Sequence, residues 1–165
     1  MQRNMYLDID GVIAVWDDEN SCVEVSRGYG YLMRFCKLHG IQPHWLSMWC
    51  NSPDHITGVS RLLWPDCCST MASPIITNLD GRQKSDCIDY SAEFVWIEDG
   101  ISEYDADNLR RHDALHRFFW TSGRDPDCLH KFIDFTCRVF GIDNSPSFHC
   151  DECPGIGKPK QKGMV

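Results

Sequence analysis

Long apolar runs are absent from this chain of 165 residues. No segment approaches the run of about 18 apolar residues that a membrane-spanning helix needs, so no membrane partner is expected. The residues before the first apolar run form no signal core, so no secretory leader is expected either. Together these absences favour a cytoplasmic protein.

Cysteines and basic residues are too few to define the class of protein. The 10 cysteines fall short of the density of a disulfide scaffold, and in a reducing compartment we expect them to stay free thiols. Lysine and arginine total 16, against 24 aspartates and glutamates, which gives a net charge of −8. Because nucleic-acid binding normally needs a basic face, nucleic acid is expected here only as a substrate.

One spacing among the cysteines is typical of half a zinc site. Cys150 and Cys153 form a CxxC pair directly after His149, and Cys128 and His130 could supply the remaining two ligands. A second CxxC is lacking. A structural zinc site therefore stays an alternative to reduced thiols without bound metal.

The length and composition are those of one globular domain. Hydrophobic residues make up 42% of the chain and charged residues 24%, which is enough to build a core. We expect a single domain over 1–153. The segment 154–165 has glycine, proline and lysine but no large core residue before Met164, and we expect it to be a disordered tail.

Apolar periodicity alternates between strand and helix along the chain. The spacing predicts strands at 5–9, 44–48, 94–97 and 117–121, a hairpin at 14–25, less regular strands within 67–77, and helices at 27–39, 52–64, 105–116 and 125–140. In the third helix Leu109 and Leu115 are expected to face the core. A turn at Asp80-Gly81 is followed by a short helix that carries Lys84. The alternation predicts an α/β fold, Rossmann-like, with three α/β/α layers and a mostly parallel sheet.

Two acidic pairs interrupt this pattern at the ends of buried strands. Asp8 and Asp10 follow the first apolar run, and Glu98 and Asp99 follow the third. Residues two apart on a strand point to one face, so the two aspartates are expected side by side. Gly11 then allows a sharp turn and leaves room for a ligand.

A hydroxyl is expected beside these acids. Ser47 ends the second predicted strand, and the carboxyl ends of neighbouring parallel strands meet at one edge of the sheet, where α/β proteins bind ligands. Acids gathered there repel one another unless a cation is present. Oxygen ligands favour a hard ion, and Mg²⁺ is the usual choice beside a substrate phosphate.

Four short motifs follow one another in order along the chain. They are Leu-Asp-Ile-Asp-Gly-Val-Ile at 7–13, Trp-Leu-Ser at 45–47, Lys84, and Trp-Ile-Glu-Asp-Gly at 96–100. In order and spacing they resemble the four motifs of the haloacid dehalogenase-like (HAD) hydrolase superfamily. The resemblance covers about residues 5–125 and implies a HAD-like fold.

The resemblance implies a role for each matching residue. Asp8 would be the nucleophile that forms an aspartyl-phosphate, and Asp10 would be the general acid–base. Ser47 would donate a hydrogen bond to the phosphate, and Lys84 would neutralise its charge. Relatives that cleave carbon–halogen or carbon–phosphorus bonds lack the second acid, so the presence of Asp10 favours phosphate-ester hydrolysis.

The resemblance also implies a Mg²⁺ cofactor. Its ligands would be Asp8, the backbone carbonyl of Asp10, and Asp99, with Glu98 bound directly or through water. The fourth motif is Glu-Asp rather than Asp-Asp, and of the two acids we favour Asp99 as the direct ligand.

Several polar residues also have simpler interpretations. Ser47 could be an ordinary strand-end hydroxyl, and Lys84 a solvated surface lysine. The acids at Glu103, Asp105 and Asp107 are expected to be helix-entry charges rather than ligands, because acids are favourable near a helix N-terminus.

The gaps between the motifs are too short for a large cap domain. A capless enzyme has an open cleft, which suits a bulky substrate such as a nucleotide, a nucleic-acid end or a phosphoprotein, or closure by a second subunit in a homo-oligomer. The expected function is therefore a Mg²⁺-dependent phosphatase acting on a phosphorylated substrate. The alternative is a catalytically silent module that keeps the fold for binding.

Overall fold

The computed structural model describes residues 2–17, 22–51, 72, 74–122 and 125–143. Several sequence predictions lie outside the described residues: the helix at 52–64, most of the segment 67–77, the tail at 154–165, and the pair Cys150 and Cys153.

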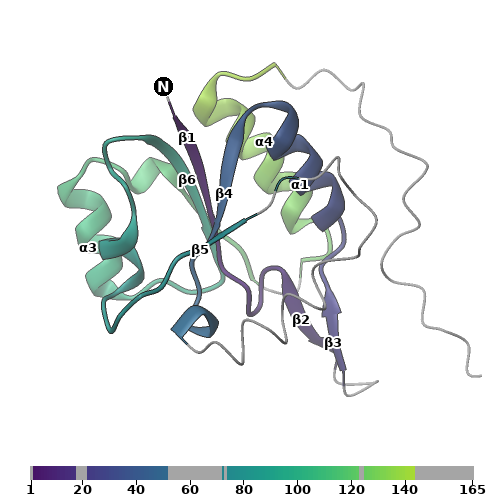
Figure 1. Cartoon of the computed structure of the whole chain (residues 1–165), viewed down its shortest axis with the longest axis horizontal. Helices are drawn as coiled ribbons and strands as arrows, with labels where there is room; N and C mark the ends of the chain where they lie inside the picture. The colour runs from purple at the N-terminus through teal and green to yellow at the C-terminus, as the bar shows by residue number, and fades with distance from the viewer. Residues whose placement is uncertain (1, 18–21, 52–71, 73, 123–124, 144–165) are drawn as a thin grey trace, which may run out of the picture.

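Five parallel strands form the sheet at the centre of the molecule (Figure 1). In order across the sheet they are β5 (Ile75–Ile76), β4 (Ile41–Trp45), β1 (Arg3–Leu7), β6 (Glu93–Glu98) and β7 (Phe118–Trp120). Each neighbouring pair runs parallel. The chain builds outward from β1 through β4 to β5 and then crosses to β6 and β7. The strand order therefore reverses between β1 and β6, and the predicted α/β fold with a mostly parallel sheet is confirmed.

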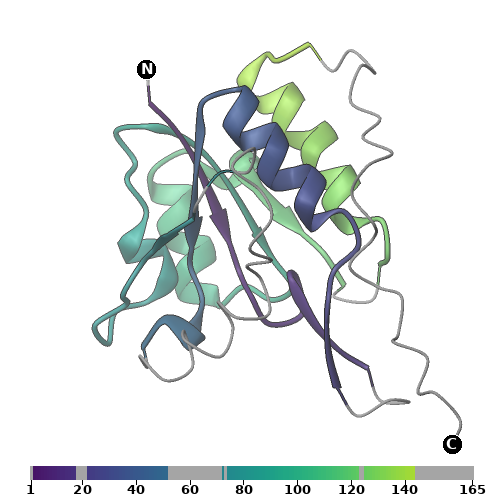
Figure 2. The same cartoon turned by 45° about the vertical axis from the view of Figure 1, so that its right-hand side comes forward.

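Helices cover both faces of the sheet (Figures 1 and 2). On one face lie α1 (Tyr29–Leu38) and α4 (Cys128–Phe140), and on the other lies α3 (Glu103–Arg111). The described loops also contain three short 3₁₀ helices, η1 (Met48–Asn51), η2 (Lys84–Cys87) and η3 (Leu115–Arg117). Within the described ranges, none of the helices is long and apolar enough to cross a membrane.

A hairpin follows β1, as the sequence predicts. Its strands, β2 (Ala14–Asp17) and β3 (Cys22–Val25), pair antiparallel. The hairpin projects beyond the edge of the sheet at which β1 ends (Figures 1 and 2).

Side-chain alternation along β1 divides the core into two layers. Met5 and Leu7 are buried with residues of α1 and α4, whereas Tyr6 is buried with Leu109 of α3. A parallel strand that is apolar on both faces is stable only at the centre of a covered sheet. This burial fixes the carboxyl end of β1 between β4 and β6.

The bounds of two strands differ from the sequence prediction. β1 ends at Leu7 rather than at residue 9, and β4 covers Ile41–Trp45 rather than 44–48. In both cases pairing between strands decides the limits, because Arg3 is in register with Ile41 and Leu7 with Trp45. Local apolar content alone could not reveal that register.

The third predicted helix is divided in two. α3 ends at Arg111, and η3 follows after Asp113, whose positive φ of 50° interrupts the helix. Leu109 is buried as expected, but Leu115 lies in η3 and is 41% exposed, so its predicted burial is wrong. The short helix expected after Asp80 is the 3₁₀ turn η2.

The remaining predicted elements are confirmed with small shifts. α1 ends before Gly40, which has the positive φ of 62° expected of a glycine beyond a helix end. The helix predicted at 125–140 is α4 (Cys128–Phe140). The strands predicted at 94–97 and 117–121 are β6 (Glu93–Glu98) and β7 (Phe118–Trp120).

Candidate metal and phosphate site

Asp8 is the first residue beyond β1 and is only 3% exposed. Its backbone N–H donates to the carbonyl of Ile97 at 3.2 Å, which extends the pairing of β1 with β6 past the end of β1. Its side-chain Oδ1 is buried and forms an ion pair with Lys84 Nζ, which lies 3.0 Å away. A buried carboxylate is costly unless positive charge lies nearby, and Lys84 supplies that charge.

Asp10 lies in the turn after β1 and is exposed. Because β1 ends at Leu7, strand alternation does not orient the two aspartates as expected. The chain instead turns sharply, with the N–H of Ile13 donating to the carbonyl of Ile9 at 3.0 Å. The turn separates a buried Asp8 from an Asp10 that meets solvent.

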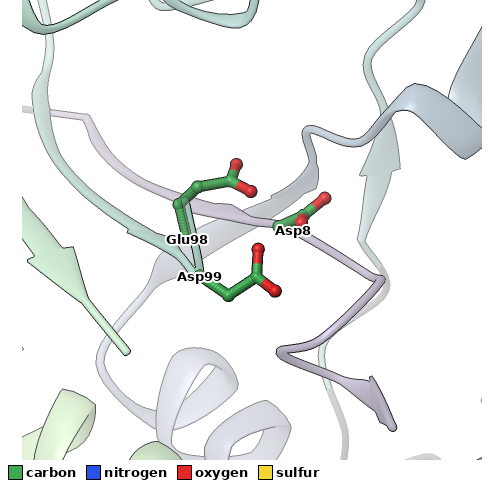
Figure 3. Close-up of side chains that lie close together, drawn as sticks. All are labelled: Asp8, Glu98 and Asp99. Carbon is green, nitrogen blue, oxygen red and sulfur yellow. The ribbon is translucent and has the colours of Figure 1, made fainter. Parts of the chain in front are cut away.

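Three carboxylates converge where β1 and β6 end (Figure 3). Asp8, Glu98 and Asp99 each offer one oxygen, and these oxygens lie within 4.8 Å of one another. Glu98 is 3% exposed, whereas Asp99 is exposed to solvent. We call these three residues the acidic cluster. Its members are three of the predicted site residues, brought together from distant parts of the chain.

Gly11 makes room for the side chain of Asp99. It has a φ of 73°, which favours glycine, and a Cβ at this position would overlap Oδ2 of Asp99. The sequence predicted that Gly11 leaves space for a ligand. In the structure the carboxylate of Asp99 occupies that space.

Lys84 lies against the acidic cluster, as its predicted role requires. Its Nζ is 2.7 Å from Oε2 of Glu98 and 3.0 Å from Oδ1 of Asp8, and its side chain is 16% exposed. A solvated surface lysine is therefore not the correct interpretation of this residue.

The electrostatics of the site are dominated by negative charge. Burial raises the pKa of Glu98 well above its ordinary value, and the Asp8 carboxylate adds to this shift. Burial also raises the pKa of Asp99, together with the charges of Asp8 and Asp10. For Lys84, burial alone would lower the pKa, but attraction to Asp8 and Glu98 outweighs it and the net shift is upward. All three shifts have the sign expected where carboxylates outnumber cations.

The acidic cluster fits a hard divalent cation. With its acids ionised, the cluster carries two more negative charges than Lys84 neutralises. The donors are all oxygens, which suit Mg²⁺, Ca²⁺ or Mn²⁺ rather than a soft metal. Asp8 and the exposed Asp99 each offer a carboxylate oxygen that could bind such an ion.

β4 carries the chain to Ser47 at the same edge of the sheet as Asp8. The N–H of Leu46 donates to the carbonyl of Leu7 at 2.9 Å, so β4 follows β1 up to the residue before Ser47. Ser47 is 1% exposed, and its Oγ accepts a long hydrogen bond of 3.4 Å from the N–H of Trp49. That contact leaves the hydroxyl proton available for donation.

A buried polar network joins the lysine turn η2 to α3. The N–H of Ser85 donates to Oδ1 of Asp105 at 2.9 Å, and Nδ2 of Asn108 donates to Oγ of Ser85 at 3.1 Å. The sequence prediction treated Asp105 only as a helix-entry charge. The spacing Ser102-x-x-Asp105 is a capping-box signal that could have identified its local role, but no local signal shows its contact with Ser85.

The proposed zinc ligands within the described residues do not converge. Cys128 and His130 are two apart on α4, so they face different sides of the helix. Cys128 is 4% exposed in the core, whereas His130 is exposed and stacks on Tyr31 at 5.8 Å between ring centroids. These two residues cannot complete one zinc site together.

Comparisons with known proteins found no relative. No family model, no curated protein and no solved structure matches this chain.

Proposed function

We propose that the protein is a capless, HAD-like, Mg²⁺-dependent phosphatase that hydrolyses phosphate monoesters through an aspartyl-phosphate on Asp8. One observation carries the proposal. Asp8 is a buried carboxylate that is ion-paired with the Lys84 ammonium at 3.0 Å and lies beside two further acids. A carboxylate nucleophile needs no deprotonation, but it needs positive charge nearby when a phosphate dianion approaches.

The two aspartates have distinct tasks in this proposal. A carboxylate oxygen of Asp8 attacks phosphorus, and the bond from phosphorus to the leaving oxygen breaks. Asp10, which is exposed, donates a proton to that leaving oxygen and then takes a proton from the water that hydrolyses the aspartyl-phosphate. The burial of one aspartate and the exposure of the other support this division.

Lys84 and Ser47 stabilise the phosphate. Lys84 lies close enough to Asp8 to neutralise the charge that builds up when Asp8 bonds to phosphorus. Ser47, buried at the end of β4, donates its hydroxyl proton to a phosphate oxygen.

Asp8, Asp99 and the backbone carbonyl of Asp10 are proposed to hold Mg²⁺ directly. Glu98 is already engaged by Lys84 at 2.7 Å, which favours contact with the ion through water. When bound, Mg²⁺ supplies positive charge that draws in the phosphate and balances the acidic cluster.

The compartment proposed for this activity is the cytoplasm. Each cysteine whose side chain is described is a free thiol, which suits a reducing environment: Cys36, Cys50, Cys87, Cys128 and Cys137.

Hydrolysis of p-nitrophenyl phosphate with and without Mg²⁺ tests the proposal. We expect Asp8→Asn to lower kcat by about a thousandfold or more, because a carboxamide is a poor nucleophile and a weak ligand. Asp107→Asn is the matched control, since Asp107 is an exposed acid on α3 that pairs with Arg110.

Two results would contradict the phosphatase. One is activity that survives Asp8→Asn in a folded protein. The other is a wild-type protein that shows no hydrolysis with any divalent metal. In the second case, binding of Mg²⁺ without turnover would favour the silent binding module, and a Mg²⁺-dependent rise in Tm would detect it.

A further inference from the structure

The turn that carries Lys84 needs support from outside itself. η2 is a 3₁₀ helix of four residues, and its N-cap residue Gln83 makes no side-chain capping bond. Such short turns have poor hydrogen-bond geometry of their own. The ammonium of Lys84 nevertheless lies within 3.0 Å of both Glu98 and Asp8.

Ser85, the next residue, is held at all of its polar groups. It is fully buried, and its N–H donates to Oδ1 of Asp105 at 2.9 Å. Its Oγ accepts from Nδ2 of Asn108 at 3.1 Å, and its carbonyl accepts from the hydroxyl of Tyr90 at 3.1 Å. The residue next to Lys84 is therefore held by two side chains of α3, Asp105 at its N–H and Asn108 at its Oγ, and by Tyr90 at its carbonyl.

Asp105 is itself immobilised through both carboxylate oxygens. Oδ1 accepts from Ser85, and Oδ2 accepts from Oγ of Ser102 at 2.6 Å. The N–H of Asp105 donates back to Oγ of Ser102 at 3.1 Å, which caps α3. Asp105 is only 5% exposed, whereas an ordinary acid at the start of a helix is solvated.

The first turn of α3 thus lies between two parts of the site. By the chain, it follows Glu98 and Asp99 after a loop of three residues, Gly100 to Ser102. It is also hydrogen-bonded to the turn that carries Lys84, because Asp105 and Asn108 both bind Ser85. A shift of this turn would move the lysine relative to the acids.

We propose that Asp105 is a positioning residue that acts through the N–H of Ser85 to hold the Lys84 ammonium between Asp8 and Glu98. Asn108 supports the same turn through Oγ of Ser85. The catalytic consequence rests on the proposed function, whereas the placement of the ammonium does not.

The first test measures activity. Asp105→Ala leaves the N–H of Ser85 buried without an acceptor, so the turn relaxes and Lys84 moves. We expect kcat for p-nitrophenyl phosphate to fall by about tenfold to a hundredfold, with KM changed less, because small misplacements of a catalytic group have effects of that size. Asp105→Asn keeps an oxygen for Ser85 and should restore most of kcat, and Asp107→Ala should match wild type.

A double-mutant cycle separates positioning from a general structural effect. If Asp105 acts through Lys84, then Asp105→Ala should change kcat little in a Lys84→Ala background. An equal loss in both backgrounds overturns the proposal.

The second test does not depend on turnover. Pulse acetylation with mass spectrometry measures how fast each lysine amine reacts, and Lys84 should react slowly in wild type because it is buried and ion-paired. Asp105→Ala and Asn108→Ala should increase the rate at Lys84 at least severalfold, while exposed Lys131 keeps its wild-type rate. Asn108→Ala leaves the cap formed by Ser102 and Asp105 intact, so it serves if Asp105→Ala does not fold.

The two proposals fail in different ways. Unchanged kcat and unchanged acetylation of Lys84 in folded Asp105→Ala and Asn108→Ala overturn the positioning role. An inactive wild type whose Lys84 acetylation still responds to these variants overturns the phosphatase and supports the positioning role.

Discussion

Gly11 is the residue on which the shape of the acidic cluster depends most directly. Its lack of a Cβ lets the Asp99 carboxylate approach the turn after β1, and its φ of 73° lets the chain make that turn. The approach brings Asp99, the residue after β6, close to Asp8, the residue after β1. A single absent methyl group therefore determines whether the carboxylates that follow two strands can lie this close together.

Gly11→Ala tests this dependence. The new methyl group would displace the Asp99 carboxylate, and we expect the affinity for Mg²⁺ to fall by about tenfold or more, together with a loss of about 1 kcal/mol in the free energy of unfolding from backbone strain. Isothermal titration with Mg²⁺ and urea denaturation measure the two effects.

Gly40→Ala is the matched control for strain. Gly40 also has a positive φ, of 62°, but a Cβ there would meet no other atom within 4 Å. It should lose stability and keep the Mg²⁺ affinity of wild type. Equal Mg²⁺ affinity in Gly11→Ala and wild type would show that Asp99 is not a ligand.

At the scale of the element, β4 combines a candidate site residue with a half-buried titratable group. The strand places Ser47 at its carboxyl end and turns His44 toward the layer of Tyr6, whose ring centroid is 4.9 Å away. Nε2 of His44 is buried and has no hydrogen-bond partner among the described residues. Burial lowers the pKa of His44, and the charge of Asp89 opposes part of that shift.

This strand gives the protein a pH-dependent stability. Below about pH 6.5 an unfolded histidine takes up a proton that the folded His44 resists. The unfolded state then binds more protons, so the contribution of His44 to stability decreases as the pH falls through that value. As the pH falls from about 7.5 to 5.5, we expect the free energy of unfolding of His44→Gln to rise relative to that of wild type.

Urea denaturation at several pH values measures the difference. His116→Gln, at an exposed position, controls for the loss of a surface imidazole. Parallel curves of unfolding free energy for wild type and His44→Gln would contradict the expectation.

At the scale of the whole molecule, large apolar side chains stand exposed around the candidate site. Met48 follows Ser47 directly and is 63% exposed. Trp120 is 61% exposed and lies in register with Glu98 on the neighbouring strand. If the proposed phosphatase function holds, exposed apolar groups at such a site would suit a phosphate ester whose leaving group is itself apolar or aromatic.

Trp120→Ala tests this preference. We expect kcat/KM for 1-naphthyl phosphate to fall by about fivefold to a hundredfold, because stacking on an aromatic ring contributes about 1–3 kcal/mol. The value for glycerol phosphate, which has no ring, should stay near that of wild type.

Leu38→Ala is the control for this variant. Leu38 is 54% exposed at the end of α1 and precedes β4, so it lies at the opposite edge of the sheet from the acidic cluster. Equal losses for the aromatic and the aliphatic substrate in Trp120→Ala would mean that Trp120 supports the fold rather than the leaving group.

The sequence predicted the layers of the molecule and most members of the candidate site. Strands with apolar residues on both faces, separated by amphipathic helices, allow little besides a covered parallel sheet. Acids after two of those strands had to meet at one edge once the sheet formed. Asp8, Glu98 and Asp99 were identified this way, by chemistry that is visible in their immediate neighbours, whereas Lys84 was assigned only through the resemblance of the four motifs to the HAD superfamily.

What the sequence determined by itself is which residues carry charge at the ends of strands and which faces are apolar, because both depend on nearest neighbours along the chain. Only the tertiary structure decided that Asp99 fills the space beside Gly11 and that Asp105 binds the turn of Lys84. These contacts join residues far apart in the chain, so they depend on strand register and helix docking. Strand register and helix docking cannot be predicted from the local sequence pattern.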